Sequence, residues 1–186
     1  SHPARLPLMR SFAARPPFRV ARFPLHRFGE RGELLAQLDL RIHYFGHFSA
    51  DARWNHPDQV LANNAFYLVL SGDGELADRW KSTPLRAGQA YLLPLGTPVS
   101  VRCRTRIEKY WGLFELGLLP GMDLLDGLRG YQELGPLPPE ALSALRKPME
   151  GRGAAEYLWV HGLLGLLLSR LGETLERQVQ AQTSRG

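Results

Sequence analysis

The spacing of apolar residues changes once along this chain, near residue 117, and this change limits the fold more than any other feature of the sequence. Before residue 117, apolar and polar residues alternate over short stretches, which is typical of β-strands with one buried face. After it, apolar residues recur every three or four positions, which is typical of helices. Short strands separated by turn residues and followed by helices predict a mainly β sandwich or barrel with helices at its C-terminal end.

Turn residues within the β region predict two hairpins. Gly72-Asp73-Gly74 follows a strand over residues 65–71 and predicts a turn from which the chain returns. Strands over residues 98–104 and 107–116 are joined so closely that a second hairpin is expected, with Arg104-Thr105-Arg106 at its tip. The first strand is predicted earlier in the chain, with one inward face formed by Leu38, Leu40, Ile42, Tyr44, Gly46 and Phe48.

Two helices are predicted after the β region. Pro138-Pro139-Glu140 is a typical helix start, and that helix ends before Pro148. A longer helix is predicted over residues 154–178, and because apolar residues cover most of its surface, one neighbour cannot bury them all. It is therefore either buried inside the domain or packed between the barrel and a second subunit. Its heptad-like seam predicts a dimer interface at Tyr157, His161, Leu164, Leu168, Leu171 and Leu175.

Positive charge is concentrated at the N-terminus. Residues 1–31 carry seven arginines against Glu30, a net charge of +6, whereas the other 155 residues hold 16 basic and 17 acidic side chains, a net charge of −1. A domain that binds DNA needs basic side chains on its folded body to neutralise phosphates. The near-neutral body therefore argues against direct nucleic-acid binding by this chain.

Cysteine content and hydropathy indicate the compartment. The chain has one cysteine, Cys103, so no disulfide framework holds the fold. The N-terminal stretch has no continuous apolar segment typical of a signal peptide. The most apolar run, residues 157–168, is far shorter than the roughly 20 residues that span a bilayer. These features predict a cytoplasmic protein with no membrane partner.

Parts of the β region resemble a known family. The stretches that carry the resemblance are residues 66–76, residues 84–98 and Tyr110-Trp111-Gly112-Leu113-Phe114. The most specific element is Gly88, five residues, Pro94, one residue and Gly96, where glycine and proline turns set the ends of strands. Together with the paired helices, residues 38–178 resemble the cupin-type sensor domain of AraC-type bacterial transcriptional regulators. This resemblance implies a cupin-like double-stranded β-helix, a jelly-roll barrel, followed by two α-helices.

The resemblance also implies how the chain is organised. Residues 1–33 are expected to form an N-terminal arm, residues 34–120 the sensor barrel, residues 121–178 a helical dimerisation region and residues 179–186 a linker. The linker would lead to a helix-turn-helix DNA-binding domain that this chain does not contain. The implied protein is a homodimer and not an enzyme, in which a small-molecule effector binds in the barrel and controls DNA binding through the absent domain. Aromatic stacking together with a few polar groups would suit a sugar or an aromatic metabolite as the effector. The arm either closes over the effector or is a partly ordered extension, and the plug in the first case is Phe12, Phe18 or Phe23.

No metal and no cofactor are expected. Metal-binding cupins place a histidine three residues after the glycine at position 96, and this chain has Val99 there. No His-x-His pair followed by a glutamate precedes the turn at residue 72. His43 and His47 share a strand face but are separated by about 13 Å along a strand, which is too far to share one ion.

The resemblance places the ligand at the barrel mouth, where an aromatic residue at the position of Trp111 stacks on apolar rings or on a sugar. Lys109 lies two residues earlier and points the same way, and if it is buried there, its ammonium needs an acceptor or an anionic ligand. The alternative is that Lys109 is an exposed lysine. The predicted ligand-binding residues are Trp111, Lys109, Arg53, Trp54, Tyr44 and Tyr67.

Two other functions stay open at this point. A stand-alone cupin enzyme without metal, such as a sugar isomerase, would need a titratable pair in the barrel, for which Lys109 with Glu115 is the one candidate. A pure dimerisation module would instead have a filled barrel with no space for a ligand.

Overall fold

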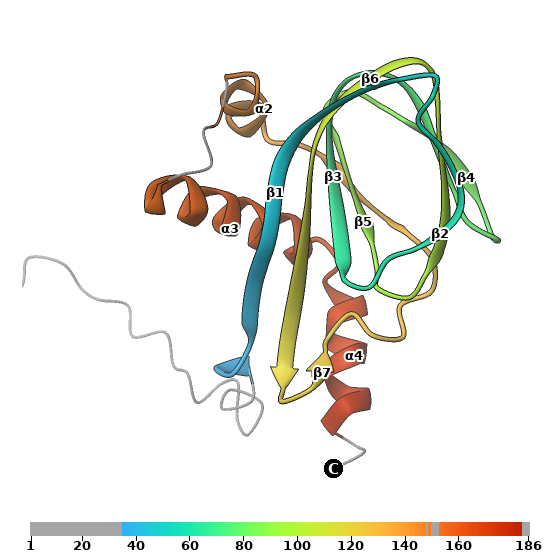
Figure 1. Cartoon of the computed structure of the whole chain (residues 1–186). Coiled ribbons are helices and arrows are strands. Elements are labelled where there is room, and N and C mark those ends of the chain that lie inside the picture. Colours follow the sequence, from blue (N-terminus) through green and yellow to red (C-terminus); the bar gives the residue numbers. More distant parts are fainter. Residues whose placement is uncertain (1–34, 148, 150–152, 184–186) are drawn as a thin grey trace, which may run out of the picture.

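A curled antiparallel sheet followed by helices forms the body of the protein in a computed structural model (Figure 1). The structure describes residues 35–147, 149 and 153–183. The eight strands of the sheet are β1 (Asp39–Asp51), β2 (Asn55–Val60), β3 (Asn64–Ala77), β4 (Ser82–Leu85), β5 (Gln89–Leu93), β6 (Pro98–Leu119), β7 (Met122–Asp123) and β8 (Gln132–Pro136). The helices are α2 (Pro139–Leu145), α3 (Ala154–Ser169) and α4 (Glu173–Thr183).

The long strands β3 and β6 pair with each other and belong to two layers at once. In the first layer, β6 also pairs with β1 and β3 also pairs with β5, which continues to β8. In the second layer, the other half of β6 pairs with β2 and the other half of β3 pairs with β4. Two layers that share their long strands form a jelly-roll barrel. The predicted mainly β fold class is confirmed.

Both hairpins predicted within these strands are wrong. Gly72 of β3 pairs with Ile107 of β6, and Gly74 pairs with Cys103, so the two supposed turns lie opposite each other inside a continuous strand pair. The register shifts there, and Gly72 has a φ of +111°, at which a Cβ would overlap the carbonyl oxygen of Arg106. The turn-forming residues therefore bend two long strands at the corner between the layers, instead of ending them.

A bulge divides β1 into two segments that use opposite faces. The register shifts between Ile42 and Tyr44, which leaves His43 as an extra residue. Ile42 pairs with Phe114 on the side of the helices, whereas Tyr44 pairs with Leu113 on the side of the barrel interior. The prediction of one continuous inward face is wrong, because one extra residue reverses the alternation of side chains.

Two hydrophobic clusters lie on opposite sides of the first layer. Odd-numbered residues of β6 line the barrel interior. The buried ones are Val99, Val101, Cys103 and Ile107, and Trp111 and Leu113 are partly buried against this cluster. The other face of the layer packs against the helices through Tyr110, Phe114, Leu116 and Leu118. The two faces of a single strand thus contribute to two separate cores.

The helices cover the outer face of the first layer (Figure 1). α2 begins after Pro138, as predicted, whereas the predicted helix over residues 154–178 is two helices. The break falls between Ser169 and Glu173, where Gly172 has a φ of +36°. None of the helices in the described ranges is both long enough and apolar enough to cross a membrane. The predicted arm, with its candidate plug residues Phe12, Phe18 and Phe23, lies outside the described residues.

Candidate functional site

A lysine is buried inside the barrel. Lys109 lies on β6 between Ile107 and Trp111, and the alternation of the strand turns its side chain into the barrel interior, where it is 2% exposed. The alternative of an exposed lysine is therefore wrong. Within the described part of the chain, the ammonium of Lys109 makes neither a hydrogen bond nor an ion pair, although lysine rarely stays fully buried without a partner.

Four aromatic rings surround the Lys109 ammonium, and we call them the aromatic box. The distance from Nζ to the ring centroid is 3.3 Å for Tyr67, 4.7 Å for Phe48, 4.7 Å for Trp54 and 5.8 Å for Trp111. Such ring faces attract a cation through their quadrupole. They supply no lone pair, however, so the three N–H donors of Lys109 have no acceptor among them.

The hydroxyl of Tyr67 is a second polar group without a partner in the barrel interior. The side chain is 5% exposed, and no hydrogen bond joins its hydroxyl to another described residue. Burial raises the pKa of Tyr67, and burial lowers the pKa of Lys109 well below its usual value. Both shifts have the same cause, because a low-dielectric interior disfavours the charged form of each group. The site thus holds two buried donors that the rest of the barrel does not satisfy.

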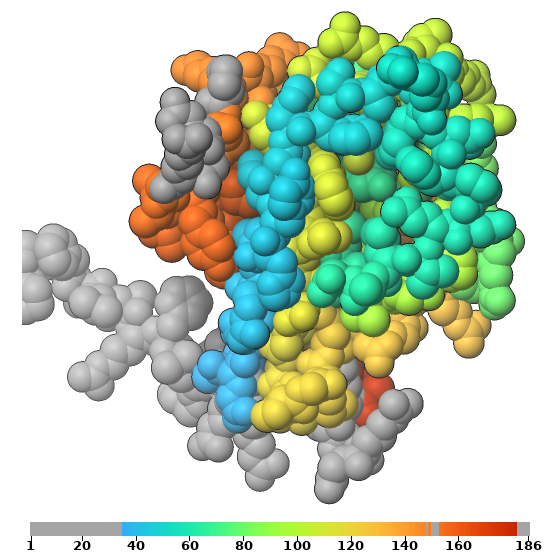
Figure 2. Space-filling view, viewed as in Figure 1, coloured from blue at the N-terminus to red at the C-terminus, as the bar shows by residue number. Residues whose placement is uncertain are grey.

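The box opens toward one side of the barrel. Phe48, Trp54 and Trp111 are only partly buried, and Tyr44 packs its ring on Trp111 with centroids 4.9 Å apart. The Tyr44 ring folds over Gly46, where a Cβ would overlap its hydroxyl. Figure 2 shows a face of the molecule on which yellow atoms of β6 are visible between the blue atoms of β1 and the teal atoms beside them. Tyr44 and Trp111 therefore form the rim of the box.

Arg53 lies apart from the aromatic box. Its guanidinium donates to both carboxylate oxygens of Asp51, with N to O distances of 2.8 to 3.1 Å, and its side chain is 91% exposed. The hydrogen bonds from Arg53 lower the pKa of the Asp51 carboxyl to about 2. Of the six predicted ligand-binding residues, the structure brings together Lys109 and four aromatic residues, and it leaves Arg53 in solvent.

Phe48 is the member of the box that the sequence did not single out. It pairs with Lys109 across β1 and β6, and this register follows from the bulge at His43. The proposed pair of Lys109 with Glu115 does not form, because the Glu115 carboxylate accepts from Asn63 at 3.5 Å and faces His43 at 3.3 Å. No carboxylate or imidazole within the described barrel forms an ion pair with Lys109.

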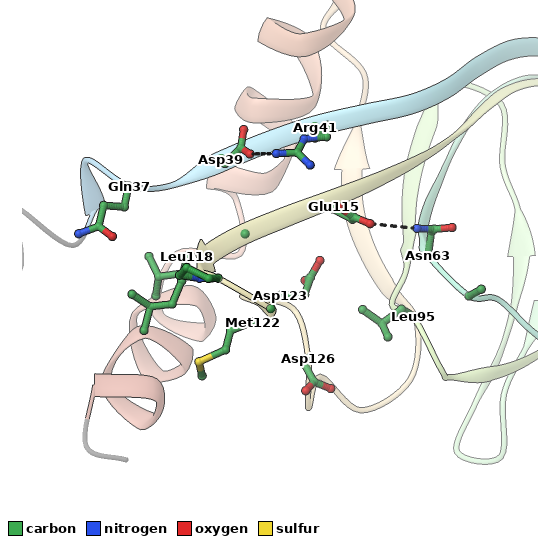
Figure 3. A pocket seen from close by; sticks show the side chains of 15 residues that line it. Gln37, Asp39, Arg41, Asn63, Leu95, Glu115, Leu118, Met122, Asp123 and Asp126 are labelled. Atoms are coloured by element: carbon green, nitrogen blue, oxygen red, sulfur yellow. Dashed lines mark hydrogen bonds and ion pairs between the residues drawn. The ribbon is translucent and has the colours of Figure 1, made fainter. Parts of the chain in front are cut away.

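Two cavities lie outside the aromatic box. The larger, about 660 Å³, is at the end of β6 near β7 (Figure 3). There Arg41 pairs with Asp39 of the same strand, and Asp123 accepts from the Asn64 amide at 2.8 Å, which links β7 to the start of β3. The smaller, about 230 Å³, lies between β1 and α3. Neither cavity is lined by Lys109, Trp54, Tyr67 or Phe48.

The predicted dimer seam, which runs from α3 into α4, is turned mainly toward its own barrel. Leu164 and Leu168 are 1% and 3% exposed and pack in the core beneath the helices, which corrects their assignment to a subunit interface. His161 is partly buried, and its Nε2 lies 3.0 Å from the carbonyl oxygen of Leu40 on β1. Leu171 and Leu175 are partly buried against the same core, whereas Tyr157 is exposed. Sequence periodicity could not separate the inner from the outer seam, because α3 is apolar on all sides.

The outer face of α3 carries apolar side chains that nothing in the described chain covers. Leu158 is 67% exposed and Leu166 is also exposed. Gly162 and Gly165 lie between them, and no described atom would come within 4 Å of a Cβ at either position. No other described segment therefore packs closely on the backbone of α3 at these two glycines.

The histidines on β1 are held by carboxylates. His47 Nε2 lies 2.9 Å from an oxygen of Glu108, and His43 Nε2 lies 3.3 Å from an oxygen of Glu115. Among the residues that the structure describes, no group of three or more His, Cys, Asp or Glu side chains is arranged to hold a metal ion.

No protein-family model matches this sequence, and no curated protein matches it either. Solved structures with a similar fold include a cupin superfamily protein from Desulfitobacterium hafniense, with 13% identity, a TM-score of 0.36, and coverage of 41% of this chain and 76% of that one. A putative ethanolamine utilization protein Q from Salmonella typhimurium has 15% identity, a TM-score of 0.35, and coverage of 41% and 68%. ToxT from Vibrio cholerae has 9% identity, a TM-score of 0.44, and coverage of 73% and 57%. The predicted cupin-like class agrees with the barrel topology, and at these TM-scores the similarities carry no argument about function.

Proposed function

We propose that this chain is the effector-sensing and dimerisation part of an AraC-type bacterial transcriptional regulator. In this proposal a small molecule binds in the barrel and controls DNA binding by a helix-turn-helix domain. The observation that carries the proposal is the pair of buried, unpartnered donors, Lys109 and Tyr67, inside an aromatic box that opens at one side of the barrel. Unsatisfied polar groups of this kind converge at binding sites because a ligand supplies their missing partners.

Strand β1 offers a physical route from the box to the helices. Phe48 contributes one ring of the box, and the carbonyl oxygen of Leu40 on the same strand is bonded to His161 of α3. A ligand that displaces Phe48 shifts β1, and α3 packs on that strand. Binding then changes the population of two arrangements of the helices, which is the usual thermodynamic basis of such a switch.

The exposed face of α3 is the proposed dimer contact. Leu158 and Leu166 present apolar surface next to two glycines, and a second copy of this face would cover them. This moves the proposed interface from the inner seam to the outer one.

The experiment that tests the sensor role is a ligand screen read by tryptophan fluorescence and Tm. Trp54 and Trp111, two of the four tryptophans, lie in the box, so a bound ligand should change the emission and raise Tm. A Trp80→Phe variant is the control, because Trp80 is an exposed residue outside the box. The same ligand should alter operator binding by the regulator that carries the helix-turn-helix domain.

One observation favours a second candidate, a dimerisation module with a filled barrel. Neither of the two cavities described above reaches Lys109 or its four rings. In that case the ring faces are the permanent partners of the ammonium, and no small molecule in a broad screen would change either tryptophan emission or Tm.

A further inference from the structure

We infer that the ligand of the barrel is an aromatic monocarboxylate, whose carboxylate accepts hydrogen bonds from Lys109 Nζ and Tyr67 Oη. This inference rests on the proposed function and names the chemical class of the effector. Of the two effector classes expected from the sequence, a sugar or an aromatic metabolite, it selects the second.

The charge of the barrel interior points to an anion. Lys109 is the one charged side chain among the buried residues of the described chain; the other buried polar residues are Asn64 and Thr97. No carboxylate of the described chain lies within ion-pair distance of its ammonium. Burial disfavours the protonated form of Lys109, and a neutral ligand would leave that cost in place, whereas a carboxylate stabilises the ammonium and accepts its N–H groups.

The number of free polar groups points away from a sugar. A sugar bound in a buried site needs a partner for each of several hydroxyls. The other two tyrosines of the barrel interior are already used, since Tyr91 donates to the carbonyl oxygen of Pro84 and Tyr131 donates to Thr83. Lys109 and Tyr67 remain, and they match the two oxygens of one carboxylate.

The single positive charge also selects the charge of the ligand. A phosphate monoester carries close to two negative charges at neutral pH, and one lysine neutralises only half of this. The nearest arginine to the box in sequence, Arg53, is exposed and occupied by Asp51. A monocarboxylate therefore fits the local charge better than a phosphate.

The walls of the site select a flat apolar body for the ligand. Trp54 and Trp111 flank the ammonium, and Tyr44 stacks on Trp111 at the open side. Aromatic ligands stack on such faces in offset or tilted arrangements. The ring of the ligand would lie between the carboxylate-binding end and the rim, in contact with these side chains.

The test compares acids with their neutral amides. Benzoate, phenylacetate and indole-3-acetate, and the three corresponding amides, are titrated into the protein by calorimetry. The expected result is that at least one acid binds about 10- to 100-fold more tightly than its amide, because a charge-assisted hydrogen bond has no equivalent in the amide complex. Lys109→Met should remove this preference by weakening the acid alone, and Tyr67→Phe should weaken the acid to a smaller extent.

Two matched controls separate the outcomes. Lys81→Met removes an exposed lysine that also lies over a tyrosine ring, at 4.2 Å from the centroid of Tyr131, and should leave acid binding unchanged. Lys109→Arg keeps the charge and should retain a preference for the acid. Equal affinity of acid and amide, or an acid preference that survives Lys109→Met, would overturn the inference while leaving the sensor role intact. If none of the acids binds but a sugar or other neutral compound binds in the box, the inference is again wrong and the proposed function stands. If neither acids nor neutral compounds bind, the proposed function itself fails.

Discussion

Replacing Lys109 by methionine should make the ligand-free protein more stable. An unpaired buried ion costs several kcal/mol after relaxation of its surroundings, and the four ring faces at 3.3 to 5.8 Å offset about 2 kcal/mol of this. Methionine has a similar shape and no charge, so it should fill the same space against the rings. We expect the free energy of unfolding to rise by about 1–3 kcal/mol, and Tm by about 2–4 °C for each kcal/mol in a chain of this size.

The advantage of Lys109→Met should depend on pH in a defined direction. Burial lowers the pKa of Lys109 in the folded protein, whereas the unfolded chain keeps the ordinary value of 10.5. Between those two pKa values the unfolded state binds more protons, so the stability of the wild-type protein rises with pH. The difference between variant and wild type is therefore largest at low pH and shrinks as the pH rises toward 10.5.

Urea unfolding of both proteins at several pH values, followed by circular dichroism, measures this difference. Lys81→Met is the matched control, because Lys81 is exposed and should change stability by less than about 0.5 kcal/mol. A Lys109→Met protein that is less stable than the wild type, while the control is unchanged, would refute the reasoning: the ammonium would then be a net stabilising partner of the rings.

Three further predictions concern the fold and its assembly. Gly72→Ala should destabilise the protein by about 1–3 kcal/mol in urea unfolding, because a Cβ overlaps the Arg106 carbonyl oxygen at a φ of +111°; Gly96→Ala, at φ +70° with open space around it, should cost about 1 kcal/mol. Leu158→Glu should leave circular dichroism unchanged and convert a dimer to a monomer in light scattering, whereas Leu164→Glu should unfold the chain; a Leu158→Glu dimer would exclude the outer face of α3 as the interface. Hydrogen bonds from Ser82 and Arg102 lower the pKa of Glu75 to about 2, so its contribution is present above pH 4.5 and is lost as the pH falls toward 2. The Tm difference between wild type and Glu75→Gln should shrink over that range, and a constant difference would contradict this assignment.

The alternation of residues predicted the side of β6 that faces the barrel. Lys109 and Trp111 were expected to point the same way, and both belong to the aromatic box. The prediction for Lys109 and Trp111 was correct because a β-strand places residues two apart on the same face, independently of the rest of the fold. Phe48 was also expected to face inward, but its place beside Lys109 could not be predicted, since it depends on the register of β1 against β6, which the bulge at His43 sets.

The prediction of hairpin turns from glycine-rich segments failed at the position where two long strands bend. Glycines 72 and 74 have the composition of a hairpin turn, but they lie at a corner where β3 crosses from one layer to the other. The same backbone freedom serves both purposes, so only the pairing of β3 with β6 distinguishes them. The long predicted helix failed for a related reason, because its range runs across Gly172, whose positive φ lies in the break between α3 and α4.

The single cysteine of the chain lies inside the barrel, where its reactivity depends on how often the barrel opens. Cys103 lies on the inner side of β6, is buried, and has a pKa that burial raises, so the intact protein should react slowly with alkylating reagents. Alkylation then requires the two layers to separate locally, and its rate measures how often they do. The alkylation rate of this native cysteine, followed by mass spectrometry, thus measures how often the barrel opens, and no cysteine has to be introduced for the experiment.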